Sequence, residues 1–125
     1  MSDILGIGVD IEEIVRFEGL LGDWGGRFEK KVFTEDEIAY CRGKLIPAQH
    51  FAARFAAKEA FSKAIGTGWR GQFSWKDVEV CNDDNGKPSF RLHNSLADQF
   101  GQFNIHLSLS HSTAYVTAMV VVERG

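Results

Sequence analysis

Residues 47–65, PAQHFAARFAAKEAFSKAI, form the stretch that decides the fold. A proline suits the first turn of a helix, and Gly66 follows as a stop signal, so these residues predict one long helix. Its apolar side chains fall on one broad stripe at about 100° per residue: Phe51, Phe55, Phe61 and Ile65. We therefore expect this helix to pack against a hydrophobic layer.

Four charged side chains on this helix are candidates for function. Glu59 lies at the edge of the apolar stripe, beside two alanines that leave room next to it, and Lys63 follows one turn later. A simple ion pair between Glu59 and Lys63 explains this spacing as well as a ligand-binding carboxylate does. Arg54 and Lys58 form a second pair at the same spacing, which indicates either a nearby anion or solvent-exposed charges with buried stems.

Residues 4–11, ILGIGVDI, alternate with period two and predict a strand. One face carries Leu5, Ile7, Val9 and Ile11, and the other carries Ile4, Gly6, Gly8 and Asp10. The two glycines leave the second face bare, so another backbone or a ligand can approach it closely. Asp10 and Glu59, on two separate elements, would suit Mg²⁺, which takes one or two protein carboxylates together with phosphate oxygens. The residues alone thus indicate a site for Mg²⁺ and a diphosphate.

The remaining segments predict an α+β fold with a mainly antiparallel sheet packed against one long and several short helices, in a single domain over residues 1–125. Thr34 and Glu37 form a capping-box pattern that opens a helix over 35–42. The other expected elements are a helix over 12–21, a loop over 66–75, strands over 76–81 and 89–92 around an Asn-Gly turn, a short helix ending at residue 100, and strands over 104–110 and 114–123. The last strand is apolar on both faces, so we expect it to be central.

Composition excludes several classes of protein. The chain has 125 residues, a formal net charge of −3 and two distant cysteines, Cys41 and Cys81. This balance is not typical of a dedicated nucleic-acid binder, and two cysteines do not make a disulfide scaffold. No apolar run is long enough to span a membrane, and the first residues do not resemble a signal peptide. We therefore expect a cytoplasmic protein with free thiols.

Several motifs together resemble one family, the holo-acyl-carrier-protein synthases, which are the small bacterial class of 4′-phosphopantetheinyl transferases. The motifs occur in family order along nearly the whole chain: Gly6 to Ile11, Phe33-Thr34 with Glu37, Arg54 to Ala60 followed by Lys63-Ala64 and Gly66-Thr67-Gly68, Asn85 to Pro88, and Ser108 to Ser112. The block from Arg54 to Gly68 is the most specific of them. The residues 22–27, with Trp24, look individual to this chain.

The resemblance implies a reaction and roles for individual residues. Coenzyme A would donate its 4′-phosphopantetheine arm to a serine of an apo-acyl carrier protein, in fatty acid biosynthesis, leaving adenosine 3′,5′-bisphosphate. Asp10 and Glu59 would bind Mg²⁺, and Lys63 would stabilise the leaving phosphate. The residues implied to bind coenzyme A are Arg54 and His111, at its 3′-phosphate, together with Lys63, Gly66, Gly68, Asn85, Gly86 and Pro88. The base that accepts the serine proton stays open: Glu59, acting through a metal-bound water, Glu37 or another group.

The resemblance also implies partners. Carrier proteins are acidic, so a chain of net charge −3 needs a local basic patch, for which Arg16 and Arg27, with Lys30 and Lys31, are the candidates. Known members of the class are trimers with active sites at subunit boundaries, so a homotrimer is expected. Two other functions stay open on the residues alone: a Mg²⁺-dependent nucleotide diphosphate hydrolase, and a non-catalytic module that binds a carrier protein or a nucleotide.

Overall fold

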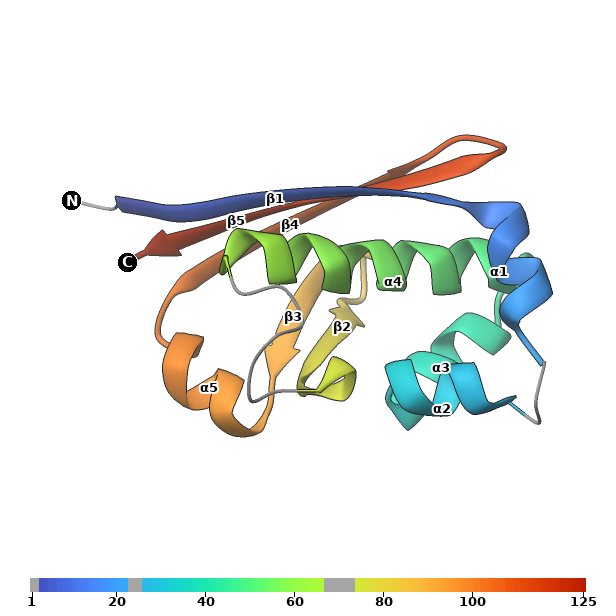
Figure 1. Ribbon diagram of the computed structural model, residues 1–125, viewed down its shortest axis with the longest axis horizontal. Helices are drawn as coiled ribbons and strands as arrows, with labels where there is room; N and C mark the ends of the chain where they lie inside the picture. The colour runs from blue at the N-terminus through green and yellow to red at the C-terminus, as the bar shows by residue number, and fades with distance from the viewer. Residues whose placement is uncertain (1–2, 23–25, 67–73) are drawn as a thin grey trace.

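A computed structural model describes residues 3–22, 26–66 and 74–125. The long helix α4 (Pro47–Ala64) lies between two antiparallel sheets (Figure 1). The larger sheet has the order β1-β5-β4 and consists of β1 (Asp3–Glu13), β5 (Tyr115–Arg124) and β4 (Asn104–His111). The smaller sheet pairs β2 (Val78–Asn82) with β3 (Pro88–Leu92). The predicted α+β class is confirmed, and β5 is the central strand as expected.

Helix α4 begins and ends as its sequence indicates. Pro47 occupies the first turn, and Ile65 caps the other end. Gly66 follows with φ of 82°, a left-handed conformation that favours glycine, and its N–H donates to the Lys63 carbonyl at 3.1 Å. The predicted bounds, 47–65, differ from the observed helix by one residue.

The glycine face of β1 packs directly on the backbone of α4. A Cβ atom at Gly6 would collide with the carbonyl oxygen of Ala64, and one at Gly8 with that of Ala60. The expectation of a close approach to this face is therefore confirmed, and it is the helix backbone that approaches. This contact fixes the end of β1, and with it Asp10, relative to the second half of α4.

The hydrophobic core surrounds α4 on most of its circumference. Five phenylalanines form a cluster with ring centroids 5.1 to 6.1 Å apart: Phe17, Phe28, Phe33, Phe51 and Phe55. On the sheet side, β5 contributes four buried residues: Val116, Ala118, Val120 and Val122. Truncating one buried phenylalanine to alanine typically costs about 3–5 kcal/mol, so this cluster holds the helical end of the molecule on α4.

The observed short helices agree less closely with the helices that the sequence predicted. The helices α1 (Ile14–Leu20), α3 (Glu35–Arg42) and α5 (Asn94–Phe100) were expected, and the capping box of Thr34 and Glu37 is present. The helix α2 (Arg27–Val32) and the 3-10 turn η2 (Trp75–Asp77) were not. Helix α2 follows Gly26 at φ of 81° and has no side-chain cap, so no N-terminal signal marks it. Most of the expected loop over 66–75 lies outside the described residues.

Two expectations from composition concern the described part of the chain. Both cysteines are free; Cys41 is buried and Cys81 half-buried. Burial raises the pKa of the Cys41 thiol to about 12, so this thiol is unreactive at neutral pH. Within residues 3–22, 26–66 and 74–125, no helix has the length and apolar character needed to cross a membrane.

Candidate active site

Asp10 and Lys63 meet where the end of β1 crosses α4. The Lys63 ammonium donates to Oδ1 of Asp10 at 3.1 Å and to the Val9 carbonyl oxygen at 3.0 Å. The Asp10 side chain is only 11% exposed, whereas that of Lys63 is 52% exposed. The structure therefore brings together two of the residues that the sequence singled out, with the lysine open to a ligand.

The second carboxylate oxygen of Asp10 is left without a partner. Oδ2 is buried, and while Glu12 is ionised it has no hydrogen-bond donor among the described residues; a protonated Glu12 would donate a hydrogen bond to the Asp10 carboxylate. A buried carboxylate oxygen without a donor is costly unless a cation or another donor satisfies it. Glu59, the second predicted carboxylate, lies on α4 one turn before Lys63, the lysine that contacts Asp10.

Glu12 is a third carboxyl group in this region, and the sequence analysis did not select it. It lies two residues after Asp10, on the same face of β1, and is 9% exposed. Burial, followed by the neighbouring Asp10, raises the pKa of Glu12 to about 8; Glu59 raises it further and Arg16 opposes the change. The period of two along β1 is the signal that could have identified it.

This group of carboxyls fits a hard cation. Both Asp10 and Glu59 act electrostatically on Glu12, which places all three in one region of negative potential. Among the described residues, no three His, Cys, Asp or Glu side chains are arranged as a complete metal cluster. Mg²⁺ commonly takes one or two protein carboxylates and fills its other positions with water and phosphate oxygens. The unpartnered Oδ2 of Asp10 suits such a ligand.

Arg54 lines a separate pocket of about 230 Å³ on the other side of α4. Its guanidinium lies 4.0 Å from the centroid of the Tyr40 ring and donates to Oδ1 of Asn82 at 2.7 Å. Its Nε is buried without a hydrogen-bond partner in the described chain. Three other predicted residues line the same pocket: Gly86, Pro88 and His111.

Among the described residues, three that were predicted to bind coenzyme A do not line this pocket: Lys63, Asn85 and Gly66. Asn85 is exposed in the β2–β3 turn, where its N–H donates to Oδ1 of Asp83 at 2.9 Å, and Asn82 lines the pocket instead. Gly66 is not among the described residues that line it. Gly68 lies outside the described residues. The side chain of Asn82 accepts a hydrogen bond from Arg54 and donates one to the carbonyl oxygen of Gly86 in the turn, so Asn82 is a further candidate beside Asn85.

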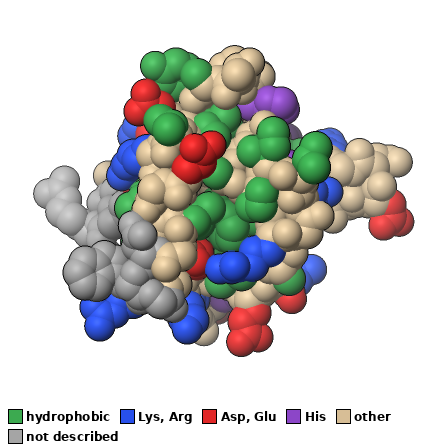
Figure 2. Space-filling model, turned by 90° about the vertical axis from the view of Figure 1, so that its right-hand side faces the viewer, with side chains coloured by type: hydrophobic (Ala, Val, Ile, Leu, Met, Phe, Trp, Pro, Cys, Tyr) green, Lys and Arg blue, Asp and Glu red, His purple; other side chains and the backbone are tan. Residues whose placement is uncertain are grey.

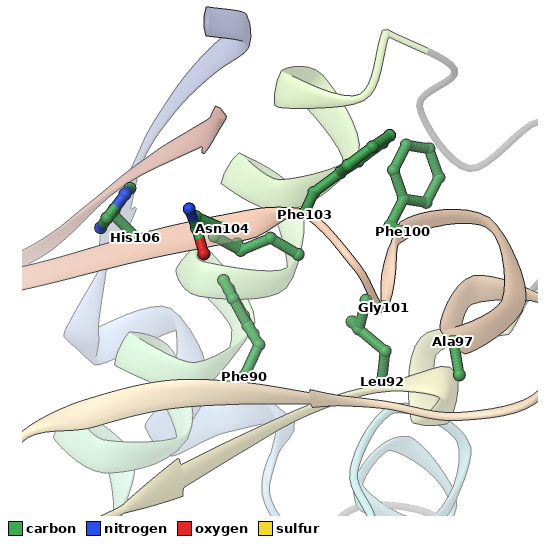
Figure 3. Close-up of a pocket in the computed structure, with 9 residues that line it drawn as sticks. Phe90, Leu92, Ala97, Phe100, Gly101, Phe103, Asn104 and His106 are labelled. Carbon is green, nitrogen blue, oxygen red and sulfur yellow. The ribbon is translucent and has the colours of Figure 1, made fainter. Parts of the chain in front are cut away.

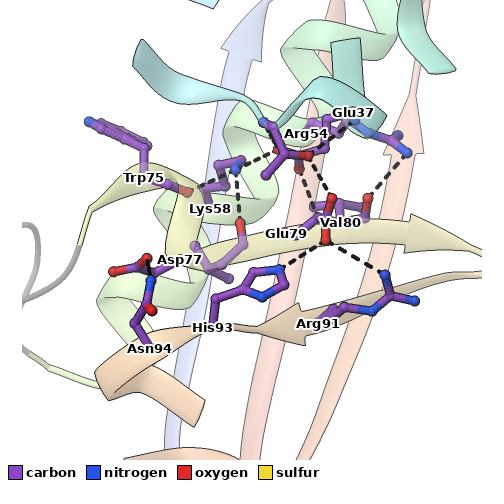
Figure 4. A network of polar contacts seen from close by, with 12 residues as sticks. Glu37, Arg54, Lys58, Trp75, Asp77, Glu79, Val80, Arg91, His93 and Asn94 are labelled. Atoms are coloured by element: carbon purple, nitrogen blue, oxygen red, sulfur yellow. Dashed lines mark hydrogen bonds and ion pairs between the residues drawn. The ribbon is translucent and has the colours of Figure 1, made fainter. Parts of the chain in front are cut away.

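Lys58 has a structural role, which corrects its interpretation as an exposed or anion-binding charge (Figure 4). It is fully buried and donates to Glu37 at 2.8 Å and to the carbonyl oxygens of Trp75 and Val78. Glu37 also accepts hydrogen bonds from the N–H groups of Thr34 and Val80, at 2.9 and 2.8 Å. The anion beside Lys58 is therefore Glu37, and the contacts of Glu37 leave it no access to a substrate.

A larger cavity, of about 410 Å³, lies between β3, α5 and β4 (Figure 3). Its walls are mainly aromatic and aliphatic, including Phe90, Phe100 and Phe103, with Asn104 and His106 at its edge. Of the described residues, none that was predicted to bind substrate or metal lines it. We therefore place the candidate active site at Asp10, Glu59 and Lys63 and the nucleotide pocket at Arg54.

The predicted carrier-protein residues lie at the α1 end of the molecule. Arg16 is exposed and pairs with Glu12 at 2.8 Å, so it is linked through Glu12 to the region of Asp10. Arg27, at the start of α2, is also exposed. Figure 2 shows this end, where hydrophobic side chains lie near the centre and basic and acidic ones are scattered around them. An acidic partner would meet basic groups mixed with acidic ones here.

Carboxylates and a lysine at one site, with a separate pocket around an arginine, suit the class of proteins that transfer phosphate-containing groups. The chain belongs to the 4′-phosphopantetheinyl transferase superfamily, whose sequence pattern matches residues 6–120. It is 49% identical over 124 residues to the holo-[acyl-carrier-protein] synthase of Geobacter sp. strain M21, covering 97% of this chain and 99% of that protein. It is 46% identical over 117 residues to the synthase of Protochlamydia amoebophila, covering 94% and 96% of the two chains.

Solved structures of similar proteins share the fold. The holo-(acyl-carrier-protein) synthase of Bacillus anthracis, in complex with CoA (3′,5′-ADP), superimposes with a TM-score of 0.82 at 40% identity and covers 98% of each chain. The synthase of Helicobacter pylori, in complex with coenzyme A, superimposes with a TM-score of 0.82 at 30% identity, covering 93% of this chain and 98% of that one. The expected family and fold are thereby confirmed.

Proposed function

We propose that this protein transfers the 4′-phosphopantetheine group of coenzyme A to a serine hydroxyl of an apo-acyl carrier protein. Adenosine 3′,5′-bisphosphate is the second product. The observation that carries the proposal is the contact of Asp10 with Lys63 beside Glu59, in a chain that belongs to the phosphopantetheinyl transferase superfamily. Transfer of a phosphoryl group depends mainly on positioning and on neutralising charge, and these residues supply both.

Mg²⁺ is the cofactor that we assign to the carboxylates. Asp10, through its unpartnered Oδ2, and Glu59 would hold the ion. When bound, Mg²⁺ would supply positive charge that lowers the cost of the negative charge on the diphosphate during transfer. Glu12, whose pKa is raised to about 8, is mostly neutral at pH 7 in the metal-free protein, and a bound cation would favour its ionised form as a third carboxylate beside Asp10.

The other residues act on the substrates. Lys63, whose ammonium is half exposed, stabilises the charge that develops on the leaving phosphate. Arg54 and His111 bind the 3′-phosphate in the pocket that they line. Glu59 accepts the serine proton, because both carboxylate oxygens of Glu37, the other candidate, are engaged by Lys58 and backbone N–H groups.

The assembly that we propose is a homotrimer. On the side of the sheet away from α4, six large apolar side chains are 40–61% exposed: Leu5, Ile7, Val9, Ile11, Tyr115 and Met119. A continuous apolar face of this kind on a sheet covered on one side only is typical of an interface. Two further copies of the chain would cover it, and would bring a neighbouring subunit close to the Asp10 end of β1.

The test must separate transfer from hydrolysis, because the same carboxylates and lysine would serve a nucleotide diphosphate hydrolase. Coenzyme A with radioactive phosphorus in the phosphate next to pantetheine is incubated with the protein, Mg²⁺ and an apo-acyl carrier protein. We expect the label to become attached to the carrier protein. No label should become attached to it when the proposed transferase is left out of the mixture. Release of labelled phosphopantetheine to water would instead identify a hydrolase, and binding without any reaction a non-catalytic module.

A further inference from the structure

The pocket around Arg54 is lined by positive or protonatable side chains. Its described lining includes Arg54, His50 and His111 and contains no Asp or Glu. Lys44 adds a fourth such group, since its ammonium lies 4.5 Å from the centroid of the Tyr40 ring that Arg54 also contacts. Three such groups lining one small cavity and Lys44 against the Tyr40 ring, with the Nε of Arg54 buried and unpartnered in the described chain, indicate a built site for an anion.

His50 is the residue in this pocket to which the sequence assigned no role. It lies on α4 one turn before Arg54, and its ring meets that of Tyr40 edge-on, with centroids 6.0 Å apart and planes at 75°. The groups that act on it come from three elements: Arg54 on α4 itself, Tyr40 and Lys44 on and after α3, and His111 on β4. An imidazole at this place can donate a hydrogen bond into the cavity.

The charge of His50 depends on what occupies the pocket. Burial first, and then the positive charges of Lys44, Arg54 and His111, hold the pKa of His50 below its usual value. In the free protein at pH 7 the ring is therefore mostly neutral. A phosphate dianion in the pocket would reverse the local potential and favour the imidazolium.

We propose that His50 is a further phosphate-binding residue, which joins Arg54 at the 3′-phosphate of coenzyme A and takes up a proton when that phosphate binds. This inference rests on the proposed function, because it requires the adenosine 3′,5′-bisphosphate part of coenzyme A to occupy the pocket. The proton comes from the solvent and is released when the ligand leaves. Affinity for coenzyme A should therefore fall as the pH rises, since binding consumes a proton.

The experiment is calorimetric titration of the protein with coenzyme A at pH 7.0 in buffers of different ionisation enthalpy. The dependence of the heat on the buffer gives the number of protons taken up. We expect wild-type protein to take up about half a proton more than His50→Gln. At pH 6.5 the variant should also bind coenzyme A about threefold to tenfold more weakly than the wild type does. At pH 8.5 its loss of affinity relative to the wild type should be smaller. Protonation of the phosphate itself is common to both proteins and cancels in the difference.

Two controls distinguish the outcomes. With 3′-dephospho-coenzyme A, which lacks the phosphate, wild type and His50→Gln should show equal proton uptake and equal affinity. His93→Gln removes a histidine that bonds to Glu79 outside the pocket, and it should behave as wild type. Equal proton uptake by wild type and His50→Gln overturns this inference. The inference is also overturned if proton uptake and affinity for coenzyme A fall only in His111→Gln. Failure of the wild type to bind coenzyme A at all would instead contradict the proposed function.

Discussion

Lys63 Nζ lies 3.1 Å from Oδ1 of Asp10, which joins the long helix to the glycine-lined strand at the candidate active site. The contact depends on backbone packing, because Gly8, two residues before Asp10, lies against the carbonyl oxygen of Ala60. The lysine therefore has a fixed position beside the carboxylates while its ammonium stays open to solvent. This arrangement suits a diphosphate, because it can stabilise negative charge on both sides of the phosphorus that is transferred.

Asp10→Asn should lower the rate of transfer on the order of a hundredfold or more, because the charge that holds the cation is lost. The shape and the contact with Lys63 are largely kept, so the fold should survive. The measurement is kcat/KM for the carrier protein at low Mg²⁺, with circular dichroism as the check on folding. A wild-type rate in this variant would remove Asp10 from the metal site.

Lys63→Ala should reduce kcat and leave the KM for coenzyme A within about threefold, because its charge matters most as the leaving phosphate forms. Steady-state kinetics with varied coenzyme A measures both constants. Lys76→Ala is a matched control, since Lys76 is an exposed lysine on η2. If KM rises while kcat stays constant, Lys63 binds the substrate without a special role in the transfer step.

Arg16→Gln should raise the KM for the carrier protein, leave that for coenzyme A nearly unchanged, and flatten the decline of activity with added salt. Rim charges act mainly on the association rate and on its salt dependence. Arg124→Gln, at the far end of β5, provides a control of equal charge. An unchanged salt dependence in Arg16→Gln would mean that the carrier protein docks elsewhere.

Glu12→Gln should stabilise the metal-free protein at alkaline pH. The pKa of Glu12 is raised to about 8 in the folded state, so its stabilising contribution is complete below pH 4.5 and is lost as the pH rises towards 8. Glutamine cannot ionise and avoids that loss, while its side-chain carbonyl oxygen can still accept the hydrogen bond from Arg16.

The check on Glu12 is the melting temperature in EDTA at several pH values. The advantage of Glu12→Gln should be small at pH 5 and largest above pH 8, and Mg²⁺ should reduce it by neutralising the carboxylates. A constant difference between the two proteins over this range would show that Glu12 does not titrate as the structure indicates.

Ile7→Lys should dissociate the proposed trimer. Ile7 lies on the exposed face of β1 and is opposite Val121 on β5, near the middle of the apolar surface. A lysine there would place a charge in an interface that excludes water. Light scattering coupled to size exclusion gives the mass of wild type and variant; Lys87→Ala, in the exposed β2–β3 turn, is the control. A monomeric wild type would contradict the proposed assembly.

The sequence predicted those parts of the fold whose signals are local. The apolar stripe of residues 47–65 and the signals at its two ends were enough to predict α4. Gly6 and Gly8 were enough to predict a close approach to one face of β1. Helix α2 escaped prediction because it is held by distant contacts, among them the ion pair of Glu29 with Arg42 at 2.9 Å. Short helices that depend on tertiary contacts leave little local pattern.

The site was predicted where residue type and spacing carried the chemistry. The sequence singled out Asp10 and Lys63 separately, and the structure brings them into contact. The partner of Lys58 is Glu37, 21 residues earlier, which no helical spacing reveals. Asn82 rather than Asn85 faces the pocket, because the β2–β3 hairpin register decides which side chain of the turn points inward. Such long-range pairings follow only from the assembled structure.

The central claim is that the phosphopantetheine group moves from coenzyme A to a serine of the carrier protein. The most direct measurement is the intact mass of an apo-acyl carrier protein after incubation with this protein, coenzyme A and Mg²⁺. The carrier protein should gain the mass of one phosphopantetheine group at its acceptor serine, and a carrier with that serine changed to alanine should gain nothing. An unchanged mass of the apo-carrier protein, with coenzyme A either intact or cleaved to free phosphopantetheine, would contradict the account.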